Sequence, residues 1–169
     1  MRSWTDSSRT SDASWRNRLL AVTLLTFVVS ACNPAPQTSP NAPAAKTTSN
    51  PVRHELEPLT KRFPALGPPI SASWTSGDMG DPRMPGPSLY WIDAIVEVSP
   101  ATADGLKAAY RPVPTADQPD VWETLRGNLP QGGYLTSDQL DQTFRSTRIS
   151  AHAFLAADAP IVVITATGE

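Results

Sequence analysis

Apolar and polar residues alternate along four segments of the chain, and this period of two predicts β-strands. The clearest alternation lies in residues 89–98, where one face carries Tyr90, Ile92, Ala94, Val96 and Val98. Asp93 and Glu97 fall on the opposite face of that strand. The four predicted strands are residues 70–77, 89–98, 147–157 and 160–168.

Two details refine the strand prediction. In residues 70–77 the apolar face consists of Ile70, Ala72 and Trp74, and serine and threonine alternate with them. Between the last two strands, Asp158 and Pro160 are typical of a tight turn. The last two strands should therefore pair with each other.

Helical periodicity and capping signals predict helices elsewhere in the chain. A short helix within residues 54–66 should end before Pro64. Ser99 is the expected N-cap of a helix that continues to about residue 110, with Pro100 at its first position. Two further helices are expected, the first in residues 117–128 and the second in residues 135–144.

The helix in residues 135–144 has the most specific start signal. Thr136 and Gln139 have the spacing of a capping box. Leu135 and Leu140 stand at the two ends of a hydrophobic staple. The sequence thus predicts Thr136 as the N-cap.

The order of these elements predicts an α+β domain. Two hairpins should form a mainly antiparallel sheet, with the two or three helices inserted between them packed on one face. The domain should comprise residues 53–169, which is enough chain for one hydrophobic core. A single cysteine excludes a disulfide within the chain.

The N-terminus has a different pattern, typical of an exported protein. Residues 1–18 carry four arginines and two aspartates, and an uninterrupted apolar run follows from Leu19 to Val29. This run is well below the roughly 20 residues that a membrane-spanning helix needs. A basic start, a short apolar run and small residues at its end predict a signal peptide in residues 1–31.

The residues Val29, Ser30, Ala31 and Cys32 resemble the lipobox of bacterial lipoproteins. The resemblance covers residues 1–32 only. It implies that a diacylglyceryl group is attached to the Cys32 sulfur and that cleavage before Cys32 makes it the first mature residue. It also implies an extracytoplasmic protein that is anchored by lipid in the cell membrane, or in the outer membrane of a two-membrane bacterium.

Residues 32–52 are expected to be a linker between the lipid and the domain. Five of the 18 prolines of the chain lie here, together with many alanines, serines and threonines and one charged residue, Lys46. Such a composition buries too little apolar surface to offset the entropy of ordering it. The 20 residues 33–52 would reach about 25 Å as a flexible coil.

Charge excludes one class of partner. Loss of residues 1–31 leaves 10 basic and 14 acidic residues, a net charge of about −4, and no basic run. Electrostatic binding to nucleic acid is therefore not expected.

Motifs for catalysis or metal binding are missing from the sequence. It has no phosphate-binding glycine loop, no His-Glu-x-x-His and no nucleophile elbow, so no cofactor or metal is expected. Of the two histidines, His54 precedes the predicted core. His152 shares a strand face with Ser150 and Phe154, where it is either a solvent-facing or hydrogen-bonded strand residue or a catalytic one.

Two features are candidates for binding. The loop of residues 76–88 carries Asp78, Asp81 and Arg83 among three glycines and three prolines, and is either a recognition loop or a long hairpin connection. Trp91 is out of phase with the apolar face of its strand. It either packs beneath another layer or contacts a partner from an exposed position.

The sequence therefore leaves two functional hypotheses. The first is a non-catalytic binding or accessory module of the cell envelope, whose partner is an envelope protein or a small ligand. The second is a small extracytoplasmic hydrolase that uses His152 with a nearby carboxylate or serine.

Overall fold

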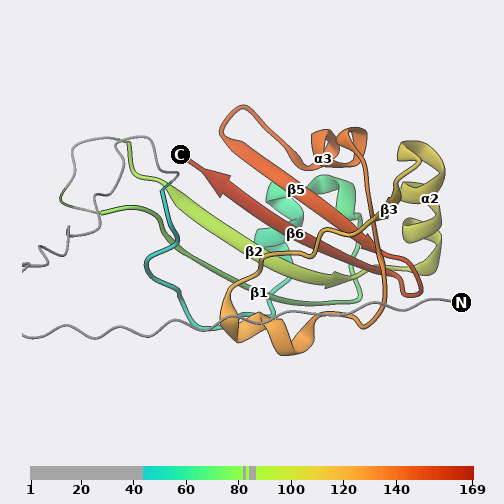
Figure 1. Ribbon diagram of the computed structural model, residues 1–169, viewed down its shortest axis with the longest axis horizontal. Coiled ribbons are helices and arrows are strands. Elements are labelled where there is room, and N and C mark those ends of the chain that lie inside the picture. Colours follow the sequence, from blue (N-terminus) through green and yellow to red (C-terminus); the bar gives the residue numbers. More distant parts are fainter. Residues whose placement is uncertain (1–43, 82, 84–86) are drawn as a thin grey trace, which may run out of the picture. The chain divides into compact units, whose positions relative to one another are not determined.

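The computed structural model describes residues 44–81, 83 and 87–169, and these form a six-stranded antiparallel sheet. The strand order is β1-β2-β6-β5-β4-β3 (Figure 1). The four long strands are the ones that the alternating pattern predicts, and two short strands extend the sheet beyond β5. The strands are β1 (Ser71–Asp78), β2 (Tyr90–Glu97), β3 (Val113–Thr115), β4 (Tyr134–Thr136), β5 (Ile149–Ala156) and β6 (Ile161–Gly168).

Helical segments precede the sheet and connect its strands, which confirms the α+β class. They are α1 (Glu57–Arg62), the 3₁₀ helix η1 (Pro64–Leu66), α2 (Pro100–Tyr110), the 3₁₀ helix η2 (Glu123–Asn128) and α3 (Asp138–Phe144). None of the described helices is long and apolar enough to cross a bilayer.

The first face of the sheet carries the larger core. Side chains of α1, η1, α2 and α3 pack against the alternating apolar positions of the long strands. Leu59, Leu140 and Phe144 of the helices are buried there, and Phe63, between α1 and η1, meets Phe144 edge to face. The alternation of residues 89–98 is thus explained, because Ile92, Ala94, Val96 and Val98 all belong to this core.

The second face carries a smaller core under η2, on the opposite side of the sheet from α1 (Figure 1). It contains Ile95, Phe154 and Val163 from three neighbouring strands, together with Val121 and Leu125. The helices between β2 and β5 therefore do not all lie on one face: α2 and α3 contribute to the first core and η2 to the second.

Residues 44–53, called here the edge segment, run along the outer edge of β1. Backbone hydrogen bonds join Thr47, Asn50 and Arg53 to β1, and Arg53 and Trp74 form an antiparallel bridge. Composition predicts a linker for most of this segment, residues 44–52. In the structure it covers the backbone groups of the edge strand, which need a hydrogen-bond partner whatever the side chains are.

Local details differ from the expectations in three places. The N-cap of α3 is Ser137, whose hydroxyl accepts from the Leu140 amide, because the Thr136 hydroxyl donates instead to the Ala153 carbonyl. Ile70 precedes β1 and is 58% exposed rather than part of the apolar face. The helix expected in residues 117–128 is the short 3₁₀ helix η2. Ser99 caps α2 as predicted.

Candidate functional site

Strand register places four polar side chains in one row across the second face. Thr75 of β1 is opposite Asp93 of β2, Asp93 is opposite Thr165 of β6, and Thr165 is opposite His152 of β5. Directly paired residues of antiparallel strands point to the same side of a sheet. With strands about 4.8 Å apart, the backbones of Asp93 and His152 are about 10 Å apart.

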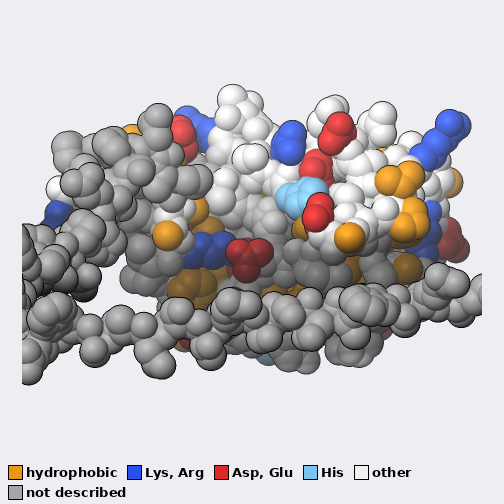
Figure 2. All heavy atoms as spheres, in the orientation of Figure 1, with side chains coloured by type: hydrophobic (Ala, Val, Ile, Leu, Met, Phe, Trp, Pro, Cys, Tyr) orange, Lys and Arg blue, Asp and Glu red, His pale blue; other side chains and the backbone are white. Residues whose placement is uncertain are grey.

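A second row lies beside this one, further from the small core. It consists of Gly77, Trp91, Thr167 and Ser150 on the same four strands. The second face therefore changes along the strands from apolar side chains under η2 to polar side chains. Figure 2 shows this side of the protein with acidic, basic and histidine side chains among scattered hydrophobic ones.

Asp93 is fully buried and has three hydrogen bonds. Lys46 of the edge segment donates to both carboxylate oxygens, at 2.8 Å to Oδ1 and 2.6 Å to Oδ2. The backbone amide of Trp122 donates to Oδ2 at 2.6 Å. Burial raises the pKa of Asp93 above its ordinary value of 3.8, and the hydrogen bonds and positive charge of Lys46 oppose this rise.

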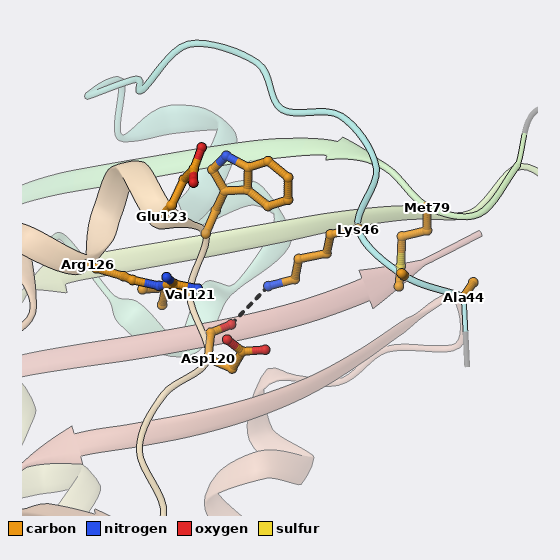
Figure 3. A pocket seen from close by; sticks show the side chains of 9 residues that line it. Ala44, Lys46, Met79, Asp120, Val121, Glu123 and Arg126 are labelled. Atoms are coloured by element: carbon orange, nitrogen blue, oxygen red, sulfur yellow. Dashed lines mark hydrogen bonds between the residues drawn. The ribbon is translucent and has the colours of Figure 1, made fainter. Parts of the chain in front are cut away.

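Lys46 reaches Asp93 from a segment far away in the sequence. Its ammonium group also donates to the Asp120 carbonyl oxygen at 3.0 Å (Figure 3). With the two bonds to Asp93, all three of its protons have an acceptor. It lies 5.0 Å from the ring centroid of Trp91. One side chain thereby joins the edge segment, β2 and the connection that leads to η2.

His152 is held by a second buried carboxylate, Asp141 of α3. The Nδ1 atom of His152 lies 2.6 Å from Asp141 Oδ2, while the other Asp141 oxygen accepts from the Ala153 amide at 2.8 Å. Arg145 lies 3.6 Å from the same carboxylate and donates from Nε to the Ala151 carbonyl. These contacts fix the imidazole and leave Nε2 as the ring nitrogen turned away from Asp141.

Two cavities open beside these groups and share Lys46 and Asp120. The polar basin, of about 330 Å³, is lined by Arg145 and His152 and by the hydroxyl-bearing residues Ser150, Thr165 and Thr167. The aromatic cavity, of about 600 Å³, is lined by Trp122, Met79, Glu123 and Arg126. Figure 3 shows Lys46 extending into it, with Ala44 and Met79 at one end and Glu123 and Arg126 at the other.

The candidate binding residues predicted from the sequence do not line the polar basin. Trp91 is fully buried: its ring stacks on Trp122 with a centroid distance of 4.9 Å and its Nε1 donates to the Thr48 carbonyl. Trp91 therefore packs beneath another layer and presents no exposed surface to a partner.

The acidic residues of the 76–88 loop have local partners. Asp78 contacts the Thr48 hydroxyl of the edge segment, and Asp81 accepts from the Arg83 backbone amide at 2.9 Å. No group of acidic, histidine or cysteine side chains in the described part of the chain is placed to hold a metal ion. Cys32, the proposed lipid attachment site, lies outside the described residues.

Sequence reasoning missed Asp93, Lys46 and Asp141. A signal for Asp93 was present, because it shares its strand face with Trp91 and Ile95, and a charge flanked by two large apolar residues indicates a covered face. Lys46 is the single charge of a segment whose composition predicts a linker. Asp141 lies within a predicted helix, where no local pattern points to a partner on β5.

Comparison with known protein families, with curated proteins and with solved structures finds no match for this chain.

Proposed function

We propose that this chain is a bacterial lipoprotein whose domain is a non-catalytic binding module of the cell envelope. In this proposal residues 1–31 are the signal peptide, Cys32 carries the lipid, and the second face of the sheet binds an envelope component. The observation that supports binding is the pair of cavities that share Lys46 and Asp120, each of which has the size of a small-ligand site.

The edge segment gives the proposed tether a short reach. Because residues 44–53 are hydrogen-bonded to β1, the chain between the lipid and the domain consists of the eleven residues 33–43. Even fully extended, eleven residues span at most about 40 Å. A lipid on Cys32 would thus keep the binding face close to the membrane, where two or more acyl chains give stable anchoring.

Replacement of the attachment residue tests the anchoring. Cys32→Ala should abolish incorporation of a clickable fatty acid and leave the protein either as unprocessed precursor or released from the membrane fraction. Cross-linking in intact cells, followed by affinity capture, should recover a partner with the anchored protein and lose it with Cys32→Ala. Unchanged fatty-acid labelling of the variant would refute the lipoprotein assignment.

The contact between His152 and Asp141 favours a second candidate, a small hydrolase. A carboxylate on Nδ1 orients an imidazole so that Nε2 can act as a general base. In the described part of the chain no serine or threonine hydroxyl is hydrogen-bonded to Nε2, so the base would act on water or on a substrate hydroxyl. Hydrolysis of ester or amide substrates by the purified protein, lost in His152→Gln, would support this candidate over the binding module.

A further inference from the structure

The floor of the polar basin is a block of four polar side chains on two adjacent strands. Ser150 and His152 of β5 lie directly opposite Thr167 and Thr165 of β6. Strand geometry sets the corners of this block about 5 Å apart across the strands and about 7 Å apart along them. These separations match the dimensions of one pyranose ring.

The three hydroxyls of this block have no protein partner among the described residues. Ser150 and Thr167 are exposed and Thr165 is half-buried. Other hydroxyls of the domain, such as those of Thr75 and Thr136, donate to backbone carbonyls. The block therefore offers hydroxyl donors and acceptors, with His152 Nε2 beside them, to a ligand.

Charge around the basin disfavours an anionic ligand. Two cations, Lys46 and Arg145, adjoin three carboxylates, Asp93, Asp120 and Asp141, so the formal charges of these five groups sum to −1. Lys46 already has an acceptor for each proton, and the Arg145 guanidinium lies 3.6 Å from the Asp141 carboxylate. A phosphate or a carboxylate would therefore meet a region of net negative charge.

The adjoining aromatic cavity supplies the apolar half of the recognition. Trp122 is half-buried, is supported on one side by the fully buried Trp91, and lines the aromatic cavity, which shares Lys46 and Asp120 with the basin. An aromatic ring that is held rigidly by stacking gives a flat apolar surface at low entropic cost. Hydroxyl donors beside such a surface suit a ligand that has polar edges and apolar faces.

We propose that the second face binds a neutral saccharide, with one sugar ring over Ser150, His152, Thr165 and Thr167 and a neighbouring ring against Trp122. This inference rests on the proposed binding function and names the class of its ligand. The hydroxyls of the first ring exchange hydrogen bonds with the block, and the apolar face of the second ring packs at Trp122.

Saccharide binding to the lipid-anchored protein, purified in a detergent without a sugar headgroup, tests the proposal. The probes are neutral oligosaccharides of glucose, mannose and N-acetylglucosamine, with glucose 6-phosphate and inorganic phosphate as anionic probes. Saturation-transfer NMR and calorimetry should detect saturable binding of at least one neutral oligosaccharide and none of inorganic phosphate.

Variants then locate the site. Thr165→Val with Thr167→Val removes two hydroxyls at unchanged shape, and the loss of two hydrogen bonds should weaken binding about tenfold or more. Thr124→Val, at an exposed position of η2 that does not line either cavity, is the matched control and should bind as the unmodified protein does. If the double variant does not fold, Ser150→Ala serves as the milder change, with a loss of about fivefold.

Three results would overturn the proposal: no saturable binding of any neutral probe, tighter binding of the phosphate probes, or equal affinity of the double variant and the control. Partner capture in cells distinguishes this failure from a failure of the proposed function. If a protein partner is captured but no saccharide binds, the proposed saccharide ligand is refuted and the proposed binding function is retained.

Discussion

The ion pair between Lys46 and Asp93 is the most consequential contact of single residues in the domain. Asp93 is fully buried, and the side chain of Lys46 is 21% exposed. Without Lys46, the Asp93 carboxylate would be a buried charge with no paired cation among the described residues. Leaving such a charge costs much more than the pair contributes relative to two apolar residues. The domain should therefore depend on the pair as a unit.

Lys46→Met should lower the free energy of unfolding by about 3 kcal/mol, because it strands the Asp93 carboxylate. Asp93→Asn added to Lys46→Met removes the stranded charge and should recover part of the loss. Denaturant unfolding of both single variants and the double variant measures the coupling. Lys61→Met, which breaks an exposed pair with Glu57, is the control and should change stability little. Additive effects of Lys46→Met and Asp93→Asn would contradict the account.

Acid titration tests the environment of Asp93. Burial raises the pKa of this carboxyl above 3.8, so the folded protein retains a proton that the unfolded chain has released. The stability that the Asp93 carboxyl contributes is fully present below pH 3.8, and it is lost as the pH rises through the folded-state pKa of this group. Relative to Asp93→Asn, the unmodified protein should become less stable over that range. The opposite slope would mean that attraction by Lys46 outweighs burial.

At the residue scale, the sequence predicted which strand face Asp93 occupies but not what covers it. Alternation predicts which residues share a face of a strand. Whether that face is buried depends on segments that are distant in the sequence and pack against it. Here the cover comes from the edge segment and from the residues that lead into η2. Strand alternation also could not predict Asp141 as the partner of His152, because Asp141 lies in the helix that precedes β5.

At the scale of elements, capping and alternation predicted most boundaries well. Ser99 and the four long strands follow from local signals. The N-cap of α3 shifted by one residue because Thr136 belongs to β4 and donates to β5. β3 and β4, three residues each, are too short to show a period of their own.

The edge segment shows why composition misleads at this scale. Pro, Ala, Ser and Thr indicate a chain that cannot form a core. Pairing with an edge strand needs backbone groups and a few anchoring side chains instead, here Lys46, Thr48 and Asn50. Close approach also requires Gly77, since a Cβ at that position would lie 1.7 Å from the Thr48 carbonyl oxygen.

Gly77→Ala should therefore displace the edge segment from β1. The added methyl group would also disturb the hydrogen bond from Trp91 to Thr48, and we expect a loss of about 1–3 kcal/mol in unfolding free energy. Hydrogen exchange should show faster exchange at the Thr47, Asn50 and Arg53 amides. Gly105→Ala, at a helical position with open space around it, is the control and should be neutral or stabilising. Unchanged protection of those three amides in Gly77→Ala would show that the edge segment does not lie in close contact with β1 at Gly77.

At the scale of the whole molecule, the sequence predicted the α+β class but not the division of the helices between two faces. Both faces of the sheet need cover, and which helix covers which face depends on connections that alternation does not report. The consequence for function is large. Because η2 covers only one end of the second face, the polar block of β5 and β6 remains accessible beside it.

In the proposed function this accessible face, and not the helical face, meets the binding partner. A photo-reactive amino acid placed at Thr167 of the full-length protein tests this in intact cells, with the same group at Ala101, an exposed position of α2, as the reference. The account predicts cross-linked products with Thr167 and none above background with Ala101. Equal products from both positions, or products from Ala101 alone, would contradict it.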